Sequence, residues 1–341
     1  MADTRFGLDI GRSFIKIVQL KSSGGKYTLL AAASVATPSG GMQSDSPIEL
    51  KKVSEAVKQC VKVAKVSGNS CNVSIIESQA ITRLVQMPNL TDKELSAAIN
   101  WEADKYIPLP IKEVNLQYKV VERYAVGTEK GGKMDVLLVA APKRVVAKYV
   151  SVVKESGLAL AAIETESAAI ARAISRGVDA ALIVVSFGAA STEVVVIRQG
   201  SVIFTRSITT GGEAITRAIM AEFGLLHQQA EEYKHAYGLT ENQLGGKVAN
   251  VIKPVLEVII GELARAIEFS RTHMQENVLT RVVISGGGAY LPGISEFITR
   301  RTSLEVSLAD PWEAFEKDGF ILKVPGQAGF YCTATGLALR S

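Results

Sequence analysis

The sequence FGLDIGRSFIKIVQL, residues 6–20, decides the fold of this chain. Its first part, Phe6–Ile10, is mostly apolar and ends at Gly11, and Phe14–Leu20 follows with several β-branched residues. This pattern predicts a strand, a glycine turn and a second strand. A further strand is expected over 27–33, which completes a three-stranded meander.

The same pattern returns in the second half of the chain. An apolar run, Ala181–Val185, precedes a turn, and strands are expected over 193–197 and 201–208. An offset of 177 residues, the separation between positions 9 and 186, places Asp9-Ile10-Gly11 on Ser186-Phe187-Gly188. The two halves therefore look like an internal duplication of one α/β unit.

Residues 81–140, between the two meanders, have a different sequence pattern. Thr91 and Glu94 have the spacing of a capping box, which predicts the start of a helix. Alternating polar and apolar residues over 114–120, and an apolar run over 134–140, predict two strands. We interpret this region as a small α+β insertion in the first half.

A helix is expected over 164–176, at the connection between the halves. The expected domains are a first lobe over 1–80, 141–178 and 316–341, an inserted subdomain over 81–140, a second lobe over 179–210 and 278–315, and a helical subdomain of that lobe over 211–277.

Composition excludes several classes of protein. The chain has 341 residues, enough for about two domains, and 47% of them are apolar, which excludes a disordered chain. The net charge of +4 is too small to indicate nucleic-acid binding by bulk electrostatics. Three cysteines, an odd number, favour a reducing compartment. No apolar run reaches the ~18 residues of a membrane-spanning helix, so we expect a cytoplasmic protein.

The two glycine turns carry the strongest prediction of a binding site. Asp9-x-Gly11 and Ser186-x-Gly188 stand at equivalent strand ends. Two facing turns of this kind can hold phosphates with backbone N–H groups, and an aspartate can hold magnesium through water. The alternative is a pair of ordinary hairpins with glycine where the turn requires it.

Three further features fit a nucleotide. Gly211 and Gly212 open a helix and would leave N–H groups free for an anion. Glu231 and Lys234 lie three residues apart on one helix face, where they either bind a ribose or pair in solvent. Gly286-Gly287-Gly288 follow a buried strand, and three absent side chains would let a base or phosphates approach the backbone.

These residues, in this order, resemble the superfamily of actins, heat-shock chaperones and sugar kinases. Asp9-Ile10-Gly11 matches its first phosphate motif, Ser186–Ala189 its second and Ile284–Gly293 its adenosine motif, and Glu166 matches the acidic position of the connecting helix. The resemblance implies a bilobed actin-like ATPase fold with two ribonuclease-H-like halves. ATP or ADP with Mg²⁺ would lie between the halves.

Within the superfamily, residues 101–110 in the insertion and 334–340 at the end are similar to the PilM family of type IV pilus assembly proteins. That family implies a cytoplasmic adaptor, peripheral to the inner membrane through its partners. It would bind the N-terminal tail of a PilN-like inner-membrane protein in a groove beside the insertion. Arg83, Trp101 and Tyr106 are the candidates for contacts with that tail.

The candidate residues of the nucleotide site are Gly11, Arg12, Ser13, Lys16, Gly188, Ala189, Gly211, Gly212, Glu231, Lys234, Gly286, Gly287 and Gly288, with Asp9 to hold magnesium through water and Glu166 as a second catalytic candidate. Two residues depart from the superfamily pattern. Ser186 stands where an aspartate is usual, and Arg12 stands where serine or threonine is common. We expect that nucleotide binding survives and that ATP hydrolysis is weak or absent, with Arg12 available to supply charge to phosphates.

Other functions remain open from the sequence. They are an FtsA-like filament-forming protein, a scaffold of type II secretion or of a competence pseudopilus, and a small-molecule kinase. A kinase needs a general base near the transferred phosphate, and no well-placed candidate is evident. Self-association is an open expectation, and we expect no nucleic-acid partner.

Overall fold

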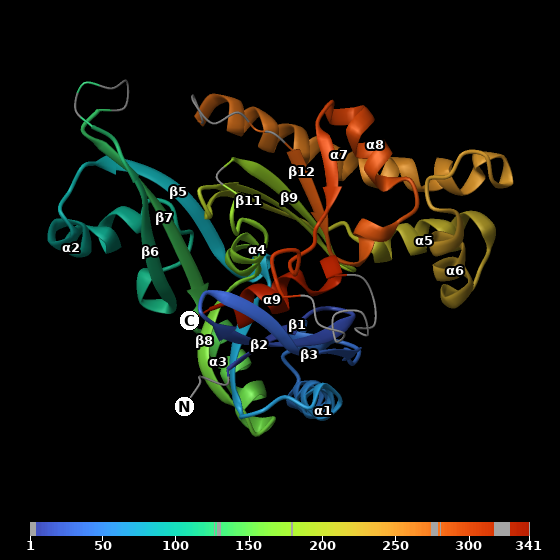
Figure 1. The fold of residues 1–341 in the computed structure, drawn as a ribbon, viewed down its shortest axis with the longest axis horizontal. Coiled ribbons are helices and arrows are strands. Elements are labelled where there is room, and N and C mark those ends of the chain that lie inside the picture. The colour runs from blue at the N-terminus through green and yellow to red at the C-terminus, as the bar shows by residue number, and fades with distance from the viewer. Residues whose placement is uncertain are drawn as a thin grey trace.

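The computed structural model describes residues 5–125, 127, 131–178, 180–273, 279, 281–316 and 328–340. The described part of the chain contains two five-stranded sheets and one three-stranded sheet, with helices packed against them. Figure 1 shows the first lobe below, the second lobe with its long helix above, and the insertion projecting to one side.

The first lobe is built on a sheet of order β3-β2-β1-β4-β8. Its strands are β1 (Phe6–Ile10), β2 (Phe14–Ser23), β3 (Lys26–Ala36), β4 (Ser70–Ile75) and β8 (Ala159–Thr165). The helices of this lobe are α1 (Pro47–Ala64), α3 (Lys143–Glu155), α4 (Glu166–Ile174) and α9 (Cys332–Ala338).

Both faces of this sheet are covered, and the alternation along β1 shows why. Phe6 and Leu8 are buried in the core that α1 and α3 form with the sheet. Gly7, between them, faces α9, where an added Cβ would lie 2.0 Å from the carbonyl oxygen of Ala334. The last helix of the chain therefore packs directly on the backbone of the first strand.

The second lobe repeats this plan. Its sheet has the order β11-β10-β9-β12-β13. The strands are β9 (Leu182–Phe187), β10 (Thr192–Arg198), β11 (Ser201–Ile208), β12 (Arg281–Ser285) and β13 (Glu305–Leu308), and the helices are α5 (Gly212–Phe223), α6 (His227–Tyr237), α7 (Lys247–His273) and α8 (Ile294–Thr302). In each lobe two antiparallel pairings are followed by two parallel ones, which confirms the predicted duplication.

The insertion is a three-stranded sheet of order β5-β7-β6 with one helix packed on it. Its elements are β5 (Ile81–Pro88), α2 (Asp92–Ala103), β6 (Val114–Arg123) and β7 (Lys133–Pro142). Thr91 and Glu94 form the predicted capping box at the start of α2. The insertion also touches the second lobe, where Arg198 Nη2 lies 2.5 Å from Glu122 Oε2.

One local prediction needs correction. The helix expected over 164–176 begins at Glu166, because Glu164 belongs to strand β8 and the Thr165 hydroxyl accepts a hydrogen bond from the N–H of Ala168 as the N-cap.

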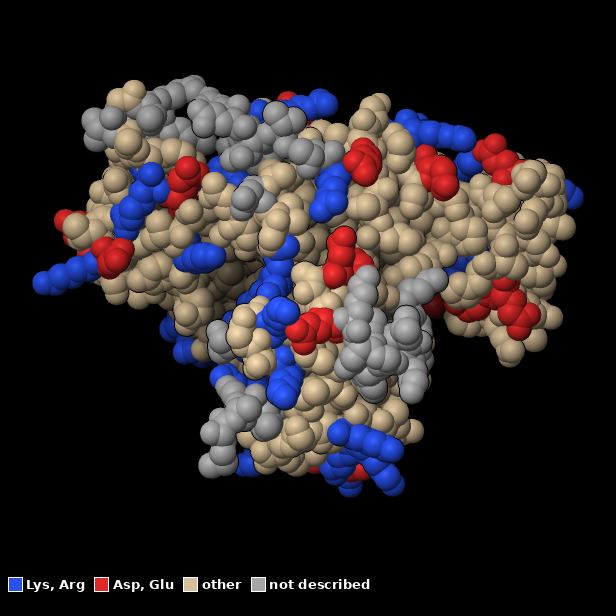
Figure 2. All heavy atoms as spheres, viewed as in Figure 1, with Lys and Arg blue, Asp and Glu red and all other residues tan. Residues whose placement is uncertain are grey.

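Three further observations concern the helices, the surface charge and the cysteines. None of the helices described is both long enough and apolar enough to cross a bilayer. Figure 2 shows Lys and Arg interspersed with Asp and Glu over the face in view, so neither sign of charge dominates it. The three cysteines are buried and free.

Candidate functional site

A cavity of about 560 Å³ lies between the two lobes. We call it the cleft. It is lined by the turn after β1, the turn after β9, the start of α5, one side of α6 and the glycine segment after β12. Among the predicted nucleotide-site residues, all except Gly211 line it.

The first glycine turn presents a buried ion pair to the cleft. The N–H of Gly11 donates to the carbonyl of Phe14 over 3.0 Å, and an added Cβ at Gly11 would lie 2.9 Å from that oxygen. Asp9 and Lys16 face each other across β1 and β2, and Lys16 Nζ lies 2.8 Å from Asp9 Oδ2. The same ammonium lies 4.6 Å from the centre of the Phe330 ring. Asp9 is thus buried and neutralised before any ligand arrives.

The second glycine turn has the same backbone and different side chains. The N–H of Gly188 donates to the carbonyl of Ser191 over 3.0 Å, and an added Cβ would again lie 2.9 Å from the accepting oxygen. Ser186 lies directly opposite Glu193 in the pairing of β9 with β10, as Asp9 lies opposite Lys16. Glu193 therefore occupies the position that Lys16 holds in the first half.

Glu193 is the cleft residue that the sequence prediction missed. The 177-residue offset that pairs Asp9 with Ser186 also pairs Lys16 with Glu193, so the sequence contained the information. Glu193 is only 3% exposed; its Oε1 accepts a hydrogen bond from Ser207 Oγ over 2.8 Å, and its Oε2 has no hydrogen-bond partner among the described residues. Burial, with Glu77 nearby, raises the pKa of Glu193 to about 8.

Two more carboxyl groups lie near these residues: Glu166 lines the cleft, whereas Glu77 is buried beside it and does not line it. Glu166 Oε2 accepts a hydrogen bond from the backbone N–H of Glu77 over 3.3 Å. Burial raises the pKa of Glu166 well above its usual range, and Asp9 and Glu193 raise it further. The Glu77 carboxylate accepts hydrogen bonds from Thr82 Oγ1 and from the N–H of Ser167. Four acidic side chains therefore lie in or beside this end of the cleft, with only one cation, Lys16, in direct contact with them in the described part of the chain.

This end of the cleft fits a hydrated magnesium ion. Besides Glu193 Oε2, the Ser285 hydroxyl is buried without a partner among the described atoms, and Ser285 pairs with Ser186 in the sheet. Oxygen atoms that lack partners are the donors that a hydrated Mg²⁺ would engage. Asp9, Glu166 and Glu193 are the residues that would hold its water ligands, and the ion would offset the excess of negative charge.

The amide groups at the start of α5 are not free, which corrects one expectation. The N–H of Gly212 donates to the carbonyl of Gly188 over 3.0 Å, and the N–H of Glu213 donates to that of Ala189 over 2.9 Å. An added Cβ at Gly211 would lie 2.6 Å from both of these oxygens. Gly211 and Gly212 thus join α5 to the second glycine turn, and they do not form an anion site.

The glycines after β12 also serve internal packing. An added Cβ at Gly286 would lie 2.5 Å from the carbonyl oxygen of Phe187, and one at Gly288 would lie 2.3 Å from the ring of Phe187. Only at Gly287 is no atom found within 4 Å of the added Cβ. Of the three glycines predicted to admit a ligand, Gly287 alone faces open space.

Glu231 and Lys234 form a partly buried pair. Lys234 Nζ donates to Glu231 Oε1 over 2.6 Å and to Thr216 Oγ1 over 2.8 Å, so the pair is not a surface contact in solvent. Although burial opposes it, the hydrogen bonds from Lys234 and Thr216 hold the pKa of Glu231 below its usual range. Both residues lie in the cleft at the α6 side.

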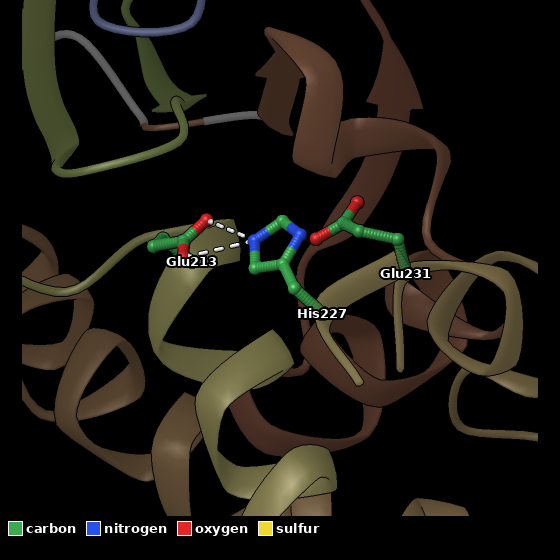
Figure 3. A group of neighbouring side chains, drawn as sticks. All are labelled: Glu213, His227 and Glu231. Carbon is green, nitrogen blue, oxygen red and sulfur yellow. Dashed lines mark hydrogen bonds and ion pairs between the residues drawn. The ribbon is translucent and has the colours of Figure 1, made fainter. Parts of the chain in front are cut away.

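Figure 3 shows the ring of His227 between the carboxylates of Glu213 and Glu231. His227 Nε2 lies 3.1 Å from Glu213 Oε1. In the described part of the chain, only these three side chains bring His, Cys, Asp or Glu donor atoms close enough to share one ion. The Lys234 ammonium beside Glu231 opposes a second cation there, and we assign no metal to this group.

Arg12 does not point at the glycine turns. Its Nη1 donates to the carbonyl of Gly40 over 3.2 Å and to Gln43 Oε1 over 3.0 Å, within the first lobe. The guanidinium therefore already has acceptors, although Arg12 lines the cleft.

A second cavity of about 390 Å³ lies between the first lobe and the insertion. We call it the insertion groove. It is lined by Gln43, Asp45, Ser78, Gln79, Ala80, Ile81, Leu109, Pro142, Arg144, Val145 and Lys148. Arg83, Trp101 and Tyr106 do not line it: Arg83 Nη1 donates to the carbonyl of Thr82, and Trp101 is 81% exposed on α2.

Comparison with known proteins decides the family. The family model of the type IV pilus assembly protein PilM matches residues 7–341. The chain belongs to the PilM family. A solved PilM structure, from a PilM–PilN type IV pilus biogenesis complex, is 28% identical, covers 100% of this chain and 99% of its own, and superposes with a TM-score of 0.84.

More distant relatives support the fold. FtsA, the cell division protein of Streptococcus pneumoniae, is 20% identical over 89% of this chain and 75% of its own length. EutJ of Escherichia coli, an ethanolamine utilization protein, is 25% identical over 37% of this chain, and the match spans only 40% of EutJ. MreB5 of Spiroplasma citri, solved with AMPPNP, superposes with a TM-score of 0.54 at 14% identity, over 97% of this chain and 94% of its own. The predicted PilM resemblance and the bilobed actin-like fold are both confirmed.

Proposed function

We propose that this PilM-family chain is a nucleotide-binding adaptor of a type IV pilus assembly platform. It would bind ATP or ADP with Mg²⁺ in the cleft and the N-terminal tail of a PilN-like membrane protein in the insertion groove. The observation that carries the nucleotide is the pair of equivalent glycine turns, Gly11 and Gly188, facing one cavity from two lobes. The PilM–PilN complex supports the partner.

Each side chain of the cleft has a separate role in this proposal. The turn amides and the Lys16 ammonium would bind phosphates, and Lys234 with Glu231 would bind the ribose. Asp9, Glu166 and Glu193 would hold the water ligands of magnesium, so that Glu193 supplies the carboxylate that Ser186 lacks. A magnesium ion held by these residues would supply positive charge to offset that of the phosphates.

Hydrolysis is proposed to be weak. A general base has to be placed for an attacking water and has to be unprotonated. Without a bound cation, burial raises the pKa of Glu193 to about 8 and raises the pKa of Glu166 well above its usual range, and Asp9 is bound to Lys16. With Mg²⁺ bound, the three carboxylates would be committed to its water ligands, so none would be free to act as the base. ATP would then act as a conformational ligand that stabilises the lobe arrangement to which it binds better.

The groove offers chemistry for a peptide that carries an acidic group. Arg144 and Lys148 of α3 supply positive charge on one wall, and Leu109 and Ile81 of the insertion supply apolar surface on the other. A partner anchored in the inner membrane would place this chain at the cytoplasmic face of that membrane. Arg83, Trp101 and Tyr106 stay predictions for contacts beyond the groove.

Thermal unfolding tests the nucleotide site. Mg-ATP at a hundred times its Kd should add about 2.7 kcal/mol to the unfolding free energy of the wild type, and the shift in Tm should shrink in Asp9→Ala. Equal shifts in the two proteins would remove Asp9 from the site, and no shift in the wild type at millimolar ATP would contradict nucleotide binding.

Fluorescence anisotropy tests the partner. A labelled synthetic peptide with the N-terminal tail of the PilN-like protein should bind the wild type, and Arg144→Glu should weaken it tenfold or more by reversing the charge of the wall. Lys58→Glu, on the exposed side of α1, is the matched control. Equal loss in both variants would indicate a general electrostatic effect, and no binding to the wild type would contradict the groove. Sedimentation with and without ATP would show whether copies associate.

A further inference from the structure

The segment Gly40–Asp45 forms a wall between the cleft and the insertion groove. It contains the short 3-10 helix Gly41–Gln43. Gln43 lines both cavities, and so does Ser78 from the loop between β4 and β5. The same side chains thus bound the nucleotide cavity and the proposed partner cavity.

From the cleft side, Arg12 holds this wall. Its Nη1 donates to the carbonyl of Gly40 over 3.2 Å and to Gln43 Oε1 over 3.0 Å. Arg12 directly follows Gly11 of the first glycine turn, and it is exposed in the cleft. A phosphate bound at that turn would lie close to the start of the Arg12 side chain.

From the groove side, Lys148 holds the same wall. Its Nζ donates to the carbonyls of Met42 over 3.3 Å and Ser44 over 3.1 Å, and it lies 2.5 Å from Asp45 Oδ1. Lys148 is largely buried on α3, where it lines the groove with Arg144. One short segment is therefore held by two cations, one from each cavity.

We infer that Gly40–Asp45 is a latch that couples occupancy of the cleft to occupancy of the groove. This inference rests on the proposed function, because it needs an anion in each cavity. A guanidinium binds phosphate through charge-assisted, often bidentate hydrogen bonds, which are stronger than bonds to a neutral carbonyl and amide. Nucleotide phosphates would therefore draw Arg12 away from Gly40 and Gln43.

The sign of the coupling follows from the loss of one restraint. With Arg12 on the phosphate, Lys148 is the remaining cation that holds the wall, beside the Met42 side chain buried in the core of the first lobe. An acidic group of the tail competes for Lys148 from the groove. A wall held from one side yields more readily than a wall held from two, so nucleotide should tighten tail binding. By linkage, the tail tightens nucleotide binding by the same factor.

The test measures the Kd of the labelled tail peptide without nucleotide and with saturating Mg-ADP. The wild type should bind the peptide at least about fivefold more tightly with Mg-ADP. In Arg12→Ala the latch is already released, so the peptide should bind without nucleotide as tightly as it binds the wild type with Mg-ADP. Gln43→Ala removes one of the two acceptors of Arg12, so it should reduce the nucleotide effect without abolishing it. Arg265→Ala, which removes an exposed arginine of α7, is the control and should retain the fivefold effect.

Several results would overturn the latch. One is an unchanged Kd in the wild type on addition of Mg-ADP. Another is Gln43→Ala with the full nucleotide effect, which would place the coupling elsewhere, such as the contact between Glu122 and Arg198. A third is Arg12→Ala with the weak peptide affinity of the nucleotide-free wild type, because Arg12 would then be a phosphate ligand and no restraint.

A measurement without the peptide keeps the latch separate from the partner. Within the wall, the N–H of Gln43 donates to the carbonyl of Gly40, and the N–H of Gly41 donates to that of Pro38, just before the wall. Mg-ADP should speed hydrogen exchange at these two amides in the wild type and leave it unchanged in Arg12→Ala. No change in the wild type would overturn the latch, whereas a peptide that fails to bind at all would contradict the proposed partner site alone.

Discussion

The two glycine turns of the cleft have one backbone and opposite side-chain chemistry. At Gly11 and Gly188 the turn hydrogen bond has the same length, 3.0 Å, and the space for a Cβ is closed in the same way. The facing pair is Asp9 with Lys16 in the first half and Ser186 with Glu193 in the second. Both halves have kept the glycine turn, in which the backbone packs too closely for a side chain. The charges of the side chains that face each other beside the turn have diverged.

The difference gives the halves different tasks. The first half is satisfied internally, because its acid and its base bind each other. The second half has a buried carboxylate oxygen and a buried hydroxyl without partners among the described atoms. A ligand that brings both a cation and phosphates would act on both halves. Its cation would engage the oxygen atoms of the second half that lack partners, and its phosphates would compete with Asp9 for Lys16 in the first half.

The largest expected effect on stability comes from removing the Asp9–Lys16 ion pair of the first half. Asp9→Ala should lower the free energy of unfolding by about 3–5 kcal/mol, because it leaves the Lys16 ammonium largely buried without its partner. Ser186→Ala, at the equivalent position, should cost about 1 kcal/mol or less. Urea unfolding measures both, and equal losses would show that the halves do not differ in this way. Asp9→Ala combined with Lys16→Met should recover part of the loss.

The next largest effect is the pH dependence of the unfolding free energy that Glu193, in the second half, should produce. The pKa of Glu193 is about 8 in the folded protein and about 4.5 for an ordinary glutamate, so the folded state holds the extra proton between these pH values. Stability therefore falls as pH rises through this window, by about 3 kcal/mol if two pKa units are realised. Glu193→Gln should remove that fall, and thermal unfolding from pH 5 to pH 8.5 without magnesium would show it. Parallel curves for the two proteins would mean that Glu193 ionises normally.

The two turns themselves should respond alike. Gly11→Ala and Gly188→Ala each place a Cβ 2.9 Å from a backbone oxygen, so each should destabilise by about 2 kcal/mol. Gly287→Ala, which meets no atom within 4 Å, is the control for both. Urea unfolding with losses that differ by more than about 1 kcal/mol would show that the turns are not equivalent.

The smallest effect comes from restoring the usual acid. Ser186→Asp places a carboxylate directly opposite Glu193, and like charges at facing positions cost about 0.2–1 kcal/mol. At pH 9 in EDTA the variant should be less stable than the wild type by that amount, and Mg²⁺ should reverse the order. A variant that Mg²⁺ does not stabilise more than the wild type would argue against an ion between these residues.

The sequence predicted the features that depend on local pattern. The strands, the two turns and the duplication follow from apolar runs and glycine positions, and nearly all the predicted nucleotide-site residues line the cleft. Strand β8 (Ala159–Thr165) was missed because its alanine-rich sequence has little strand propensity, and pairing with β4 makes it a strand. The purpose of Gly288 could not be predicted, because the Phe187 ring that fills its Cβ space lies about a hundred residues earlier.

The same limit applies to charges and to free amides. The N–H groups of α5 look available in the sequence, and only the fold brings the carbonyls of Gly188 and Ala189 to them. The contacts of Arg12 with Gly40 and Gln43 likewise depend on how the turn after β3 comes back to the cleft. The position of Glu193 in the cleft could have been predicted from the sequence, because the 177-residue offset between the halves pairs it with Lys16.

The packing of α9 on β1 has a consequence for how the chain is made. Gly7 meets Ala334, and the Asn72 side chain in β4 donates to the carbonyls of Leu337 and Arg340. Part of one face of the first lobe's sheet therefore stays uncovered until residues 332–338 have been synthesised. Domains generally fold as units in the order of their synthesis, yet here the first lobe to be translated is the last to be completed. A nascent chain halted before Cys332 would keep that apolar face open, and a holding chaperone would be its natural cover.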